Sequence, residues 1–103
     1  MADIAVTKQE IDARHGRYVA RVAGIDAEAE LTFTRRGPGL ISADHTGAPE
    51  ALRGTGAAAA LVDAMVADAR QSGFRIVPLC SYVQACLARH PDWSDVFEAV
   101  PGA

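Results

Sequence analysis

Residues 53–70 read RGTGAAAALVDAMVADAR, and the rest of the chain is organised around this stretch. Its larger apolar side chains recur at the spacing of one helical face, namely Leu61, Val62, Met65, Val66 and Ala69. Gly73 is placed to end this helix in a left-handed conformation. Gly54 and Gly56 precede it and leave the amides of the first turn open to a ligand. The stretch therefore predicts a glycine turn, an anion-binding cradle and an amphipathic helix.

The composition indicates one small domain. A chain of 103 residues without a repeat or linker is expected to form a single domain over residues 1–103. The net charge of -3 and the lack of a basic run argue against a nucleic-acid partner. The longest apolar run, residues 57–62, is too short to cross a bilayer, so no membrane partner is expected. Two cysteines are too few for a disulfide scaffold, and we expect a cytoplasmic location.

Alternation of polar and apolar residues predicts four strands before the helix, over residues 4–7, 17–22, 29–34 and 40–46. Turn residues separate them, which favours an antiparallel meander. In the fourth strand Ile41, Ala43 and His45 share one face, so His45 is expected to point toward the core or a cofactor.

A strand and a second helix are expected after Gly73. Residues 75–79 read as a short buried strand. Ser81 and Gln84 form an S-x-x-Q capping pair, which predicts a helix running to about His90. The remaining residues 92–103 are expected to dock on the body through Trp93, Val96 and Phe97. The fold class is therefore α+β, a mixed sheet with an antiparallel N-terminal meander, a central helix, a strand and a second helix.

The surrounding sequence excludes two nucleotide-binding motifs. Residues 54–59 satisfy G-x-G-x-x-A, but that fingerprint requires a buried strand directly before it and an acidic residue roughly 20 positions later. Residues 49–52 supply no such strand, and residues 74–80 contain no acid. A Walker loop requires a Gly-Lys-Ser/Thr sequence, which is absent.

A different match is more extensive. Residues 53–58 match the R-G-x-G-x-A loop of the GCN5-related N-acetyltransferases, with His45-Thr46 before it, and VPLCSY (77–82) and His90-Pro91 after it. From about Tyr18 to Pro91 the chain resembles the small, single-domain branch of that superfamily. It departs at Thr55 and Ala57, where a basic residue and an isoleucine are more usual.

This resemblance implies a three-layer α/β arrangement and the transfer of an acetyl group from acetyl-CoA to an amine. It places backbone amides around the cofactor pyrophosphate, from Arg53, Gly54, Thr55, Gly56, Ala57 and Ala58. The alternative is a tight turn that binds nothing. No metal is expected, because the histidines lack metal-ligand spacing.

The resemblance also implies a gap between two parallel strands for the pantetheine arm, beside Pro78. A proline in an edge strand is equally compatible with the residue itself. The resemblance places Cys80 near the thioester, and a thiol at a helix N-terminus can have a lowered pKa. Cys80 either accepts the acetyl group transiently or shapes the pocket while the amine attacks directly.

Two further residues are candidates for proton transfer. Histidine suits a general base near neutral pH, and His45 is either that base or a hydrogen-bonded core residue. By resemblance, Tyr82 protonates the departing thiolate. Cys86 lies on an apolar helical stripe and is expected in the core.

Three functions remain open. The first is an active N-acetyltransferase whose acceptor is a small molecule or a protein amine. The second is a non-catalytic module that binds CoA or acyl-CoA. The third is an interaction domain whose glycine turn has no ligand.

Overall fold

The computed structural model describes residues 3–98 and contains one mixed sheet in the order β1-β2-β3-β4-β5. The strands are β1 (Ile4–Glu10), β2 (His15–Val22), β3 (Glu28–Gly37), β4 (Leu40–Gly47) and β5 (Arg75–Pro78). The first four are antiparallel neighbours, whereas β4 and β5 are parallel. The helices are α1 (Ala57–Ser72) and α2 (Ser81–Ala88), with short 3-10 helices η1 (Glu50–Leu52) and η2 (Pro91–Asp95). The α+β class and the order of its elements are confirmed.

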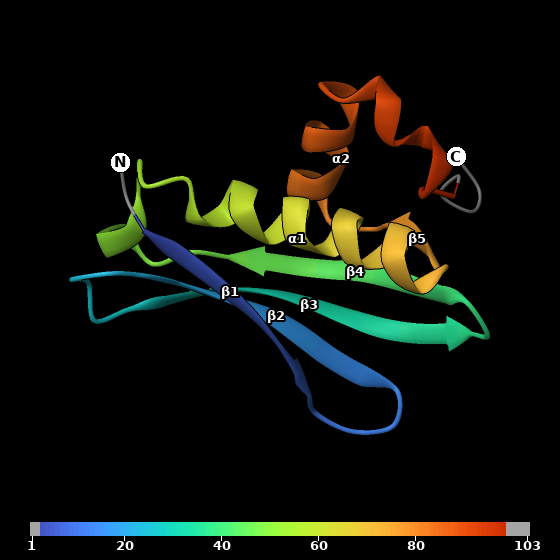
Figure 1. The fold of residues 1–103 in the computed structure, drawn as a ribbon, viewed down its shortest axis with the longest axis horizontal. Helices are drawn as coiled ribbons and strands as arrows, with labels where there is room; N and C mark the ends of the chain where they lie inside the picture. Colours follow the sequence, from blue (N-terminus) through green and yellow to red (C-terminus); the bar gives the residue numbers. More distant parts are fainter. Residues whose placement is uncertain (1–2, 99–103) are drawn as a thin grey trace.

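Both α-helices lie on the same side of the sheet (Figure 1). The core between them and the sheet contains the predicted stripe of α1, together with Leu31 and Phe33 from β3 and Val83 from α2. Residues 91–97 close one end of this core with Trp93, Val96 and Phe97, which are buried as predicted. The described residues therefore form two layers instead of the expected three, and no helix covers the opposite face of the sheet, called the outer face below.

The central helix follows its sequence pattern closely. All five residues of its apolar stripe are buried. At its end, Gly73 adopts the left-handed conformation (φ 80°) and donates its amide to the carbonyl of Ala69. Because only glycine enters this region at little cost, the chain can turn directly from α1 toward β5.

A β-bulge in β4 overturns the expected direction of His45. Thr32 pairs with His45 but Phe33 pairs with Ala43, so Asp44 is an extra residue in β4. After an extra residue the alternation of faces is reversed. His45 consequently lies exposed on the outer face, while Thr46 pairs with the core residue Leu31.

The start of α2 also differs from its prediction. Cys80, not Ser81, is the N-cap residue, and no side chain caps the helix. Gln84 instead donates its Nε2 to the carbonyl of Pro78 at 2.8 Å. The Ser81–Gln84 capping pair is thus wrong, and α2 ends at Ala88 instead of about His90.

The strands β4 and β5 remain paired further than predicted. Their register runs from Leu40–Arg75 to Ala43–Pro78, so the two strands separate only beyond these pairs. Pro78 is the last residue of an edge strand. Ile76, two residues before it, directs its amide to the carbonyl of Val96, away from β4. The missing amide of Pro78 therefore faces the same edge, and the edge-strand explanation of this proline is favoured.

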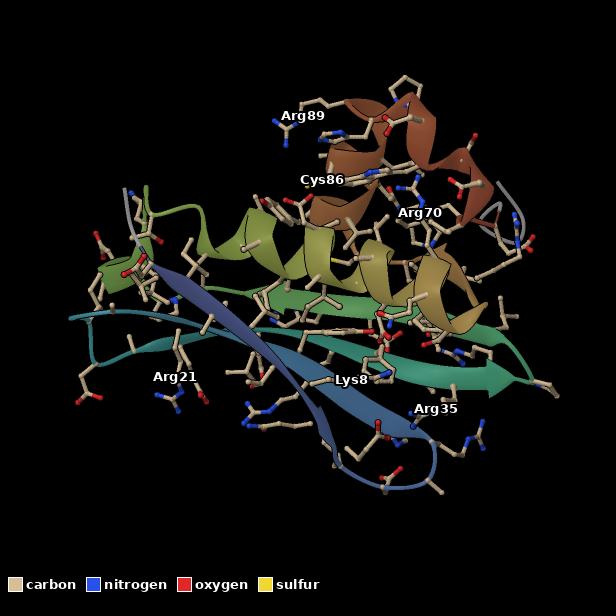
Figure 2. The ribbon with its side chains drawn as sticks, in the orientation of Figure 1. Lys8, Arg21, Arg35, Arg70, Cys86 and Arg89 are labelled. Carbon is tan, nitrogen blue, oxygen red and sulfur yellow. The ribbon has the colours of Figure 1, made fainter. Side chains whose placement is uncertain are left out.

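A salt bridge of Lys8 joins strand β1 to α1. Its ammonium lies 2.9 Å from the Asp68 carboxylate, which also accepts a hydrogen bond from the Tyr18 hydroxyl at 2.7 Å. Lys8 is labelled in Figure 2. Its ammonium lies 5.5–5.7 Å from the ring centroids of Tyr18, Phe33 and Phe74. Ion pairing and cation–π attraction thus act together at one point between the edge strand and the helix.

The close contact at Gly16 gives a test of core packing. A Cβ atom at Gly16 would lie 2.4 Å from Cζ of Phe33, which is fully buried. We expect Gly16→Ala to lower the free energy of unfolding by about 1–3 kcal/mol, because the ring has little room to shift. A Cβ at Gly37 meets nothing within 4 Å, so Gly37→Ala serves as the matched control. Urea denaturation measures both, and equal effects would contradict this packing.

Candidate active site

The loop before α1 is built on two left-handed glycines. Gly54 has φ 78° and Gly56 has φ 87°. Between them, Thr55 donates its hydroxyl to the carbonyl of Leu52 at 2.6 Å and accepts the amide of Ala57 at 3.2 Å. Thr55 therefore stabilises the loop through its own side chain, a role that sequence reasoning missed because it considered only the backbone amide of this threonine and its departure from the family pattern.

The loop amides divide into two groups. The amides of Arg53, Thr55 and Ala57 are bonded to the protein itself. Among residues 3–98, the amides of Gly54, Gly56, Ala58 and Ala59 have no hydrogen-bond acceptor. Unpaired amides at a helix N-terminus, with glycines that leave space in front of them, suit a charged phosphate group. Of the six predicted residues, only Gly54, Gly56 and Ala58 therefore have an amide open to a ligand, and Ala59 adds a fourth.

Beyond Ala43 and Pro78, β4 and β5 separate into a fork. The amides of Leu79 and Cys80 both donate to the carbonyl of Ala43, at 3.1 and 2.9 Å. The chain then enters α2, while β4 continues beside β3 to Gly47. Across the fork, the Cys80 thiol donates to the hydroxyl of Thr46 at 3.4 Å. The sequence placed Cys80 at this position, but it did not identify Thr46 as its partner.

The surroundings of Cys80 lower the pKa of its thiol. Burial opposes ionisation, but the Thr46 hydroxyl and the amides of Val83, Tyr82 and Thr46 together outweigh it and lower the pKa of the thiol. A thiolate accepts hydrogen bonds from such donors and is stabilised by the positive end of the helix dipole.

Tyr82 lies half-buried on the first turn of α2. Burial raises its pKa, and the neighbouring Cys86 thiol, one turn further along the helix, adds to the shift. Tyr82 consequently keeps its proton at neutral pH, as a proton donor must. Cys86 is buried in the core, as predicted.

His45 is separated from this arrangement. In the described chain, no hydrogen bond joins its side chain to Cys80; its carbonyl instead accepts the Thr32 hydroxyl at 3.4 Å. A Cβ at Gly47 would lie 3.2 Å from Nε2 of His45, so the imidazole extends along β4 over this glycine.

Two hollows lie on the outer face of the sheet. One of about 460 Å³ lies at the end of β4 and is lined by Arg17, Glu28, Glu30, Gly47, Ala48 and Pro49. Another of about 310 Å³ lies over β4 and β5 and is lined by Arg36, Leu40, Ser42, Val77 and Leu79. Both are accessible because no helix of the described chain covers this face.

Other site types find no support in residues 3–98. No group of three or more His, Cys, Asp or Glu side chains is arranged to hold a metal ion there. None of the helices in this range has the length and apolarity needed to cross a membrane.

Comparison with known protein families agrees with this geometry. The family model described as GCN5-related N-acetyl-transferase matches residues 17–96, most of the chain. No curated protein sequence matches it. The chain belongs to the GCN5-related N-acetyltransferase family, as its sequence motifs had indicated, and membership supports acyltransferase activity in general.

The lowered pKa of Cys80 predicts a selective reaction. We expect iodoacetamide to alkylate Cys80 faster than Cys86 near neutral pH, because the thiolate is the reactive form. Peptide mapping by mass spectrometry measures both sites in one sample. Cys80→Ser and Cys86→Ser variants assign the peptides, and preferential labelling of Cys86 would contradict the expectation.

Proposed function

We propose that this protein transfers an acetyl group from acetyl-CoA to the amine of a small molecule or a protein. One observation carries the proposal: α1 and α2 both begin beyond the carboxyl ends of the parallel pair β4 and β5, where that pair has opened. Ligands of α/β sheets bind at such edges, and two helix N-termini there can stabilise two negative charges. The first would be the diphosphate and the second a thiolate.

The loop residues would hold the diphosphate of acetyl-CoA. The donors would be the amides of Gly54, Gly56, Ala58 and Ala59, which have no acceptor among the described residues. Arg53 is exposed at the start of the loop and can add a charge-assisted contact. Thr55 and Ala57 contribute through the loop conformation, because their own amides are already bonded.

The reacting end would lie at the fork beside Cys80. Acetyl-CoA, when bound, supplies an activated acetyl thioester. Cys80 contributes a thiol with a lowered pKa, and Tyr82 retains a proton for a departing thiolate. His45 lies on the outer face and would accept the proton of an amine that approaches from that side. The cofactor and the acceptor would thus reach the fork from opposite faces of the sheet.

A non-catalytic CoA-binding module is the second candidate. The exposed position of His45, without contact to Cys80, favours it, since the described chain does not assemble a connected base and thiol. This candidate predicts acetyl-CoA binding without turnover on any amine.

A charge placed in the cradle tests cofactor binding. Ala58→Asp adds a carboxylate to the first turn of α1, where it favours the helix but repels a diphosphate. We expect calorimetry to show acetyl-CoA affinity reduced about tenfold or more, because one charge a few ångströms away costs on the order of 1–4 kcal/mol.

Ala67→Asp is the matched control. It places the same charge at an exposed position in the same helix, far from its N-terminus. Unchanged affinity in Ala58→Asp, or an equal loss in both variants, would remove the cradle from the proposal. Wild-type protein that binds no acetyl-CoA at millimolar concentration would remove the proposal itself.

Substitution of the reacting residues tests catalysis. We expect Cys80→Ala to lower kcat/KM for acetyl transfer by about 10²-fold or more, and His45→Ala to lower it as the loss of a general base does. Intact-mass spectra with acetyl-CoA alone show whether Cys80 gains an acetyl group. Full activity in Cys80→Ala would exclude transfer through this thiol.

A further inference from the structure

We propose that Thr46 is a positioning residue that orients the Cys80 thiol at the fork through a side-chain hydrogen bond and thereby makes it more reactive. The catalytic meaning of this inference rests on the proposed function. Thr46 lies near the end of β4 and Cys80 at the start of α2, and their side chains meet across the fork at 3.4 Å. Among residues 3–98 this is the one hydrogen bond that joins a side chain of β4 to a side chain at the start of α2.

The β-bulge is what directs Thr46 toward Cys80. Without the bulge, a β4 strand that continued regularly through Asp44 would turn Thr46 to the outer face, because the alternation buries Ile41 and Ala43. With it, Thr46 pairs with Leu31, whose side chain is fully buried on the core side. The same β-bulge that exposes His45 therefore places the Thr46 hydroxyl beside the Cys80 thiol.

A partly buried polar cluster stabilises the bulge. The Asp44 carboxylate accepts hydrogen bonds from the hydroxyls of Thr34 at 2.5 Å and Ser42 at 2.6 Å. Ser42 in turn accepts Nε of Arg36 at 2.9 Å. Thr34 and Ser42 are themselves buried, so this side of the bulge has little freedom to change its register.

The hydroxyl of Thr46 suits both states of the thiol. In the neutral state the thiol donates to Oγ1 of Thr46. When the thiol loses its proton to solvent, the hydroxyl rotates and donates to Sγ instead. A hydrogen bond to an ion is stronger than one between neutral groups, so the pair favours the thiolate. The amides of Tyr82 and Val83 act in the same direction from the helix side.

Two substitutions separate the hydroxyl from the shape of the side chain. Thr46→Val keeps the branched shape and removes the hydroxyl, whereas Thr46→Ser keeps the hydroxyl. Thr32→Val is the matched control, because Thr32 lies on the outer face of β3 and its hydroxyl bonds the carbonyl of His45. Thermal unfolding shows whether each variant is folded before it is compared.

The readout is the pH dependence of Cys80 alkylation by iodoacetamide, followed at the Cys80 peptide. We expect Thr46→Val to move the midpoint upward by about one pH unit and to slow alkylation near neutral pH about tenfold. Thr46→Ser and Thr32→Val are expected to keep the wild-type midpoint. A wild-type midpoint in folded Thr46→Val, or an equal shift in Thr46→Ser, would overturn the inference.

This measurement requires no acetyl-CoA, so it fails or succeeds independently of the proposed transfer. A shifted midpoint in a protein without any transferase activity would support the role of Thr46 and reject the proposed function. An active transferase whose alkylation midpoint is unaffected by Thr46→Val would support the proposed function and reject the role of Thr46.

Discussion

The separation of β4 from β5 is the constraint on which the rest of the site depends. Parallel pairing ends at Ala43 and Pro78, and the carbonyl of Ala43 accepts the next two amides of the chain as it turns into α2. One residue later, Asp44 forms the bulge that shifts β4 by one position relative to β3. Turn and bulge together open the sheet edge, place Cys80 at a helix N-terminus and bring Thr46 beside it. A regular β4 would provide none of these contacts.

The sequence predicted those parts of the fold that depend on local periodicity. The stripe of α1 and the left-handed Gly73 follow from spacing and residue type alone, and the alternation in β2 and β3 fixed their buried faces. His45 was assigned to the wrong face because the bulge depends on the tertiary contacts of Asp44 with Thr34 and Ser42, which alternation within β4 does not reveal. The S-x-x-Q pattern failed for a similar reason, since Gln84 finds the carbonyl of Pro78 in place of a helix-terminal amide.

The candidate site was recognised from its sequence motif, but the sequence predicted only some of its functional residues. The loop and Cys80 occur at positions where unpaired amides and a lowered thiol pKa are found. Thr46 was quoted merely as part of a family motif, and Thr55 as a loop amide and a departure from the family pattern. Both contribute through their hydroxyl groups. Thr46 contacts Cys80, which is distant in sequence, and Thr55 contacts Leu52 across a turn. The sequence shows Thr46 directly after His45 in the fourth strand, but only the strand register shows that its side chain faces Cys80.

Lys8 has a practical consequence for experiments on this protein. It is the only lysine in the sequence, and every other basic side chain that carries a permanent charge is an arginine. Its nitrogen is held by Asp68 and surrounded by three aromatic rings, and acylation would replace that cation with a neutral amide. The protein therefore carries a single lysine side chain that an amine-directed label could modify. In an assay with an added acceptor, label on the protein itself can be sought by peptide mapping at this lysine and at Cys80.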